Sequence, residues 1–193
     1  MARHTRPSDD ILPLATRDGL PDALRVMLAE FPRNGWATHR DFDGLASFWL
    51  DRHLGFRRVM GLLRTDAQAL IDGAMGAQDW GRRLTRLGSG FLGDLIGHHQ
   101  VEDDAYFPKL AAMEPRIARG FEVLDRDHHD LHALIDRFAS GANHALAQSQ
   151  DAARREAAAV FLADLDRFAQ MLDRHLTDEE DLIVPVVLKH RVG

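Results

Sequence analysis

Histidine and carboxylate residues recur at helical spacing along this sequence. Three pairs stand four residues apart, which places both members on one face of a helix, one turn from each other. A single histidine precedes these pairs along the chain. The full set is His53, His98 with Glu102, His128 with His132, and His175 with Glu179. Imidazole and carboxylate groups bind iron, zinc and manganese, so the set predicts a metal site.

One such pair is a weak signal, because a chain with 11 histidines and 30 acidic residues contains some by chance. An internal repeat is the stronger signal. The segments His98–Pro108 and His175–Pro185 share one pattern: a histidine, an acidic triplet that begins four residues later, and a proline four residues after the triplet. Two matched halves indicate a pseudo-two-fold arrangement with one metal ion in each half.

The two halves differ at one position. Four residues after His128 comes His132, whereas four residues after His53 comes Arg57. One metal ion would therefore have three histidine ligands and the other two, and the two glutamates of the pairs would bridge the ions. The ion with fewer histidines keeps an open position, where dioxygen, nitric oxide or peroxide can bind.

Four long helices are predicted to position these residues. Apolar residues recur at steps of three and four in four segments, and no alternating strand pattern is present. These segments are Leu45–Leu63, Trp80–Leu95, Ile117–Phe138 and Phe161–Val186. Each of the seven candidate ligands replaces an apolar residue on one of these stripes. Short connections between four helices predict an all-α, up-down-up-down four-helix bundle.

Turn and capping residues predict where the helices begin and end. Asp41 and Asp43 are candidate caps for the first helix, and Asp79 is one for the second. Pro115 suits the first turn of the third helix. Residues 141–150 are predicted to connect the third helix to the fourth.

Glycines and prolines predict two further features. A group of four glycines in the second helix either allows close packing or marks a break, and these are Gly88, Gly90, Gly93 and Gly97. Residues 1–41 are predicted to form an N-terminal extension, with a short helix from Pro21 to Phe31, and residues 42–193 to form the bundle.

Composition limits the classes of function. The net charge of −6 argues against a nucleic-acid partner. No apolar run approaches the ~20 residues that a membrane span needs. The first ten residues lack the apolar core of a signal peptide, so the sequence predicts a cytoplasmic protein. Cysteine is absent, so nitrogen and oxygen atoms must hold any metal.

Three motifs resemble the metal-binding motifs of the hemerythrin-like (HHE cation-binding) family. They read HHQVEDDAYFP, DHHDLH and HLTDEED followed by VP, and the resemblance spans residues 42–190. It implies that the seven residues above bind two non-haem iron ions with oxo and carboxylate bridges; zinc or manganese are alternatives. In hemerythrins proper the last carboxylate comes five residues after its histidine, which would be Glu180. Glu179 is preferred because it falls on the apolar stripe.

The resemblance implies a protein that binds dioxygen, nitric oxide or peroxide in oxygen, nitric oxide or redox sensing. The long extension departs from small oxygen-carrying hemerythrins and argues against oxygen transport. Iron storage or peroxide detoxification is the second hypothesis, and a metal-free helical interaction module is the third. The sequence identifies no protein partner and no catalytic constellation, so an enzyme is the less favoured reading.

Two other metal-site classes fit poorly. A ferritin-like site needs Glu-x-x-His, which no glutamate here provides. The dipeptide His129-Asp130 matches a phosphohydrolase motif, but chance alone predicts about one such pair. Because His99 and His129 lie one residue off the stripes, we expect them to be neighbours of the site. Phe48, Phe56 and Phe91 are candidates for an apolar pocket beside the open position.

Overall fold

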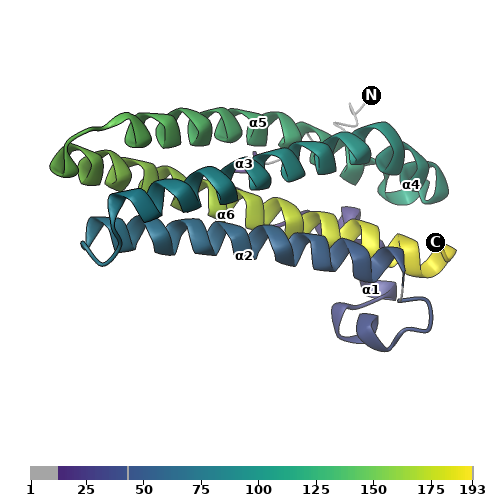
Figure 1. The fold of residues 1–193 in the computed structure, drawn as a ribbon. Helices are drawn as coiled ribbons and strands as arrows, with labels where there is room; N and C mark the ends of the chain where they lie inside the picture. The colour runs from purple at the N-terminus through teal and green to yellow at the C-terminus, as the bar shows by residue number, and fades with distance from the viewer. Residues whose placement is uncertain (1–12, 43, 193) are drawn as a thin grey trace, which may run out of the picture.

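The chain folds as an all-α bundle of four long helices, as predicted. A computed structural model describes residues 13–42 and 44–192, and no strand occurs within these ranges. The four long helices, which run antiparallel to their neighbours in the chain (Figure 1), are α2 (Leu45–Ile71), α3 (Ala77–Val101), α5 (Ala118–Ala147) and α6 (Asp151–His190). In this described part of the chain, no helix combines the length and the apolarity that crossing a membrane requires.

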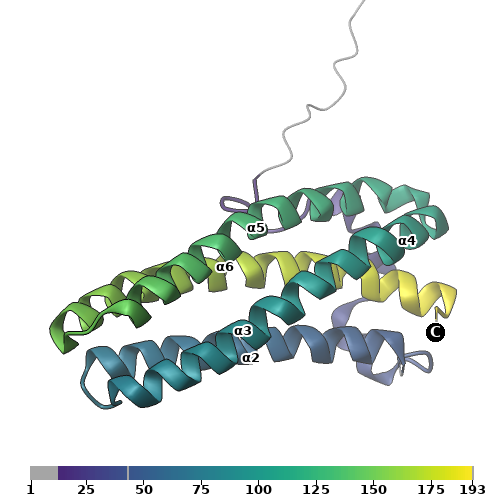
Figure 2. The ribbon, with the colours of Figure 1, turned by 45° about the horizontal axis from the view of Figure 1, so that its top comes forward.

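Two helical hairpins pack together to form the bundle. Helices α2 and α3 form one hairpin, α5 and α6 form the other, and α6 packs against both α2 and α5 (Figure 2). Buried apolar side chains gather in two clusters. Along α2, Trp49 belongs to one cluster and Phe56 to the other, and His53 lies between them. The candidate ligands therefore sit where the two clusters meet.

Helix α5 extends further than predicted. It continues to Ala147, so only three residues, 148–150, connect it to α6, and the predicted connection at 141–150 is wrong. A Cβ atom on Gly141 would lie 3.0 Å from Cδ2 of Phe161. The glycine allows α6 to pack closely against α5, and burial of Ala142 and Ala145 supports the helix beyond it. Packing thus outweighs the weak helix propensity of glycine.

The predicted caps of the first two bundle helices are wrong where the structure describes them. Gly44 is the N-cap of α2, and Asp43 lies outside the described residues. The N-cap of α3 is Gly76. Asp79 lies within the first turn, where its negative charge interacts favourably with the helix dipole. Pro115 begins a 3-10 turn (Pro115–Ile117) immediately before α5.

A π-helical segment that the sequence did not reveal follows α3. It spans Glu102–Tyr106 and leads into the short helix α4 (Phe107–Met113). A π turn widens the helix and changes the direction of the side chains that follow it, and such turns are frequent at functional sites. Glu102, one of the predicted ligands, is the first residue of this segment and is fully buried.

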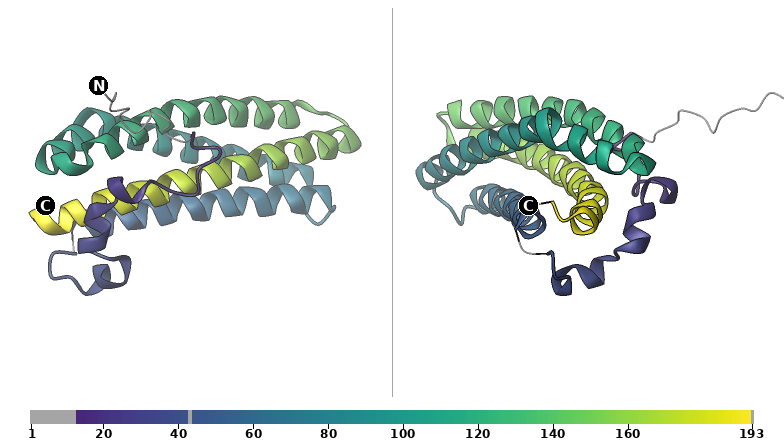
Figure 3. Two further views of the ribbon diagram at one scale, coloured as in Figure 1. Left: turned by 180° about the vertical axis from the view of Figure 1, so that it is seen from behind. Right: turned by 90° about the vertical axis from the view of Figure 1, so that its right-hand side faces the viewer.

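The N-terminal extension contains a short helix in the predicted region, but it is shorter than expected. A 3-10 turn (Asp22–Leu24) and helix α1 (Val26–Glu30) replace the single helix expected from Pro21 to Phe31. A second 3-10 segment (Arg33–Thr38) follows. The extension crosses α6 before the chain enters α2 (Figure 3).

The glycines of α3 do not break the helix, and only one of them makes a close contact. A Cβ on Gly88 would lie 3.2 Å from the ring of Phe138, whereas Gly90, Gly93 and Gly97 have open space around them. Because the solvent-facing glycines only add backbone entropy to the unfolded chain, we expect Gly93→Ala to raise the free energy of unfolding by about 0.5–1 kcal/mol.

Gly120 on α5 differs from Gly93 because it has no room for a side chain. A Cβ there would lie 2.6 Å from Cδ1 of the buried Leu182, so Gly120→Ala should lower the free energy of unfolding by about 1–3 kcal/mol. Urea denaturation of both variants measures the difference. A Gly120→Ala variant as stable as the wild type would contradict this packing.

Candidate metal centre

Seven buried side chains from all four long helices and the π segment meet in the middle of the bundle. They form two groups, and within each group one nitrogen or oxygen atom of every residue lies within 4.8 Å of the others. The first group is His53, His98, Glu102 and Glu179, and the second is His99, His128 and His175. The side chain of His98 is 9% exposed, and the others are more deeply buried.

Each of the two glutamates faces both groups. Glu102 Oε1 lies 2.9 Å from Nε2 of His98, and its Oε2 lies 3.6 Å from Nε2 of His128. Glu179 repeats the arrangement: Oε1 lies 3.5 Å from Nε2 of His53, and Oε2 lies 3.4 Å from Nε2 of His175. A carboxylate with one oxygen toward each group can bridge two metal ions, so the geometry fits a dinuclear site.

Seven buried polar atoms at this centre lack hydrogen-bond partners. Both ring nitrogens of His99, both carboxylate oxygens of Glu102, Nε2 of His128 and His175, and Oε2 of Glu179 are buried without one. Leaving a buried donor or acceptor unsatisfied costs about 1–3 kcal/mol per group. A cluster of such atoms in the described core is explained if metal ions are their partners, and the residue types suit that role.

Burial keeps three of the candidate ligand histidines in the neutral form and shifts the pKa values of both glutamates. It lowers the pKa of His98 to about 3, and it lowers the pKa of His99 and His175 as well, so these rings are neutral at pH 7. Burial, together with the adjacent Glu179 carboxylate, raises the pKa of Glu102 well above its ordinary value. Burial acts to raise the pKa of Glu179, but the charges of His53 and His98 and the hydrogen bonds with His53 and Glu102 together outweigh it, and the pKa falls. Neutral imidazole is the form that binds metals.

Carboxylates behind the centre orient two of the histidines in a pseudo-symmetric way. His128 Nδ1 lies 2.8 Å from Asp103 Oδ1, and His53 Nδ1 lies 3.1 Å from Glu180 Oε1. Asp103 directly follows one bridging glutamate and Glu180 directly follows the other, so the internal repeat of the sequence reappears as repeated geometry. A carboxylate that accepts the Nδ1 proton keeps Nε2 free for a metal.

Six of the seven predicted residues come together, and His132 does not. On α5 the residues facing the core after His128 are Leu131 and Ile135, a spacing of three and four that leaves His132 exposed at the side. His99, expected only as a neighbour, occupies the second group instead. The sequence carried a signal for it, because His99 follows the buried Leu95 by four residues, as good a helical spacing as that of His98.

Glu180 belongs to neither group of candidate ligands. Its Oε1 is paired with His53 and lies 2.7 Å from Nη1 of Arg57. Glu179, by contrast, belongs to the first group and also accepts a hydrogen bond from Nε1 of Trp49 at 2.5 Å. The structure therefore places Glu179, the preferred of the two glutamates, at the centre.

Aromatic side chains cover the half of the centre with fewer histidines. The rings of Phe56 and Trp49 lie 5.2 Å and 5.8 Å from that of His98, and Phe91 packs against Phe56 at 6.1 Å. Phe48, expected in the same lining, is 61% exposed and faces away from the core. A hollow of about 340 Å³ between α2 and α3 reaches Phe56 and Phe91 from the surface.

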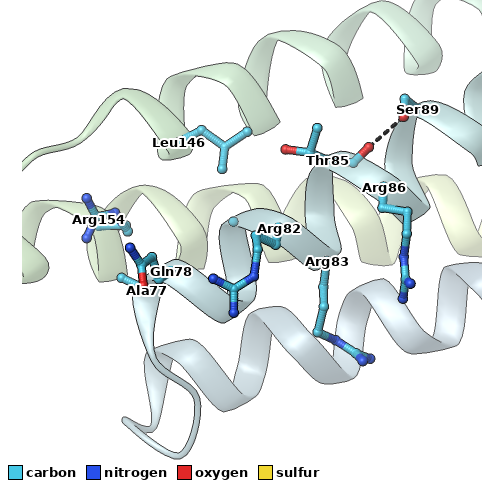
Figure 4. A pocket seen from close by; sticks show the side chains of 10 residues that line it. Ala77, Gln78, Arg82, Arg83, Thr85, Arg86, Ser89, Leu146 and Arg154 are labelled. Atoms are coloured by element: carbon cyan, nitrogen blue, oxygen red, sulfur yellow. Dashed lines mark hydrogen bonds between the residues drawn. The ribbon is translucent and has the colours of Figure 1, made fainter.

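A larger hollow of about 1140 Å³ lies elsewhere, near the turn between α2 and α3 (Figure 4). Its lining includes Arg82, Arg83, Arg86 and Arg154, and none of the seven residues of the two groups. Arg83 pairs with Asp66 on α2 at 2.6 Å. This arginine-lined surface hollow is separate from the candidate metal centre.

The fold and the site together define a class: helical-bundle proteins whose helices converge on buried histidines and glutamates. A family model described as the hemerythrin HHE cation binding domain matches residues 44–187, and the chain belongs to this family. The resemblance seen in the sequence motifs is thereby confirmed. Neither the curated proteins nor the solved structures gave a match. The matched range contains both groups of candidate ligands and leaves out residues 13–42.

Proposed function

We propose that the protein binds two iron ions between its four long helices and that this di-iron centre binds a small molecule in oxygen, nitric oxide or redox sensing. The observation that carries the proposal is the set of buried, unsatisfied ligand atoms, arranged in two groups around two shared carboxylates. Five imidazoles and two carboxylates form a nitrogen and oxygen set that suits iron. Membership of a cation-binding family supports the same reading.

Two ions account for the geometry better than one. A single ion in the first group would leave the second group of three buried histidines without a partner. It would also leave Oε2 of Glu102 and Oε2 of Glu179 facing that group without a ligand role. Zinc and manganese accept similar ligands, so metal analysis must decide the element.

The surroundings of the first group favour a small uncharged ligand. This group has two histidines and the second has three, so an ion here has the larger number of open positions. Phe56 and Trp49 cover this side and exclude water, and a dry apolar environment protects a reactive centre from side reactions. When bound, iron supplies reversible redox chemistry and coordination positions for dioxygen, nitric oxide or peroxide.

Metal analysis of the protein purified without a histidine tag tests the proposal. We expect two irons per chain by plasma mass spectrometry, one for each group. The absorption spectrum should change reversibly when air or nitric oxide is added and removed. A protein with no metal, or with a single zinc, would contradict the di-iron centre. Rapid catalytic removal of peroxide would instead favour a detoxifying enzyme over a binding protein.

A further inference from the structure

Residues 13–42, which we call the strap, lie across α6 on the outside of the bundle. They pass from the α5 side over α6 toward the start of α2 (Figure 3). Four apolar side chains, each at most 4% exposed, fix the strap to the core, and these are Leu14, Leu20, Met27 and Trp36. The strap is therefore a packed part of the fold, although it lies outside the family match.

Arg17 of the strap reaches a carboxylate that holds a ligand histidine. Its side chain is 2% exposed, Nη1 lies 2.7 Å from Oδ1 of Asp127, and Nε lies 2.8 Å from Oδ2 of Asp178. Asp127 Oδ2 in turn lies 3.4 Å from Nδ1 of His175, whose Nε2 faces the centre. A chain of charged contacts thus connects the strap to the second group.

Arg33 of the strap makes the corresponding connection to the first group. Its Nη1 lies 3.0 Å from Oε2 of Glu180, and its Nε lies 2.7 Å from Oδ1 of Asp181. The other oxygen of Glu180 is the one 3.1 Å from Nδ1 of His53. The two strap arginines therefore hold one histidine-orienting carboxylate in each half of the centre.

We propose that the strap positions the metal ligands: Arg17 through Asp127 and Arg33 through Glu180 fix the ring orientations of His175 and His53. The role rests on the proposed di-metal function. Residues 178–181 of α6 are four consecutive buried acids, and only one of them, Glu179, belongs to the metal groups. Buried carboxylates need charged partners. The strap supplies arginines to the other three. Within the bundle, Glu180 also pairs with Arg57 and Asp178 with Arg174, so the strap adds a second arginine to each of these two carboxylates.

A positioning role and a purely structural role predict different results. If the strap only covers the core, any change that weakens its packing should loosen the metal equally. If the arginines position the ligands, changes to them should matter beyond their effect on stability. Loss of such outer partners typically costs 10–100-fold in metal affinity.

The test uses one variant of each strap arginine, Arg17 and Arg33, and two control variants, all in the full-length chain. Arg33→Gln removes a charge from a side chain that is 42% exposed, so folding should tolerate it. Arg17→Lys keeps the charge but loses the planar fork that holds two carboxylates at once. Met27→Ala weakens the packing of the strap and leaves the side chains of Arg17 and Arg33 unchanged. Arg64→Gln removes a surface ion pair to Asp166 between α2 and α6.

The rate of iron release to a chelator is the main readout. We expect at least ~10-fold faster release from Arg33→Gln and Arg17→Lys than from the wild type, and a rate within about twofold for both controls. Proton NMR of the zinc-loaded protein adds a direct readout. Arg33→Gln should lose the protected imidazole N–H resonance of His53 and retain that of His175.

The outcomes separate this role from the proposed function. The positioning role would be overturned if Arg33→Gln and Arg17→Lys both released metal at the wild-type rate, or if Met27→Ala sped up release as much as they do. The di-metal centre would stand in either case. A wild-type protein that takes up no metal would overturn the proposed function, and the positioning role with it.

Discussion

Replacing His99 by alanine is expected to lower the metal content from two ions per chain to one, whereas His132→Ala should leave both ions bound. His99 is 1% exposed, and neither of its ring nitrogens has a hydrogen-bond partner. Its ring stacks on that of His128 at 4.0 Å, within the second group. His132 is exposed, and no atom of it joins either group.

Metal analysis of the two purified variants, alongside melting curves with and without a chelator, measures this difference. His99→Ala removes one of the three histidines of the second group, so the second ion should be lost selectively, whereas the first group keeps all its ligands and its ion. The reverse result, with metal lost from His132→Ala and retained by His99→Ala, would show that the loaded site uses the pair His128 and His132 given by the sequence resemblance.

Replacing Glu102 by glutamine is expected to abolish dinuclear binding while the metal-free variant is at least as stable as the metal-free wild type. Glu102 is fully buried beside Glu179, and neither of its oxygens has a hydrogen-bond partner. Burying two ionised carboxylates side by side without a metal is costly, and this cost is what raises the pKa of Glu102, whereas glutamine is neutral at every pH. The residue is thus unfavourable for the empty fold and necessary for the loaded one.

Thermal melting with and without a chelator checks this expectation. A ligand at ~1,000 times its dissociation constant stabilises a fold by about 4 kcal/mol, so chelation should lower the melting temperature of the loaded wild type. The melting temperature of Glu102→Gln should not respond. Since the raised pKa keeps Glu102 protonated without metal, binding displaces a proton, and metal affinity should rise with pH.

Glu114 provides a matched control for Glu102→Gln. It is another buried carboxylate, 4% exposed, but it pairs with Arg116 and Lys189 and belongs to neither metal group. Glu114→Gln should therefore lower stability and leave the chelator response intact. A Glu102→Gln variant whose melting temperature still falls with chelator would contradict a bridging role for this residue.

The sequence by itself determined the helical class of this protein and predicted six of the seven residues that meet in the candidate centre. Apolar steps of three and four set four helices, because only one face of each can be buried. The repeat around His98 and His175 placed a carboxylate one turn from each histidine, and that relation is local to a helix. Local geometry of this kind follows from spacing alone, so Glu102 and Glu179 were found at their observed places.

Only the tertiary structure decided which side chains at the edge of a stripe turn inward. His99 follows the buried Leu95 by four residues and His132 follows the buried His128 by four, yet the packing of α3 and α5 against their neighbours buries His99 and exposes His132. The π segment, which the sequence did not predict, begins at Glu102, three residues after His99. Rotation of a packed helix depends on all its partners, so periodicity within one helix cannot fix it.

The contacts between the strap arginines and the carboxylates behind the centre likewise depended on tertiary structure. Arg17 and Asp127 are 110 residues apart, and Arg33 and Glu180 are 147 apart. An ion pair between distant segments leaves no periodic pattern in either of them. The sequence showed an N-terminal extension and a run of four acids, and only the fold brought them together, because buried charges pair with whichever partner the chain topology carries within reach.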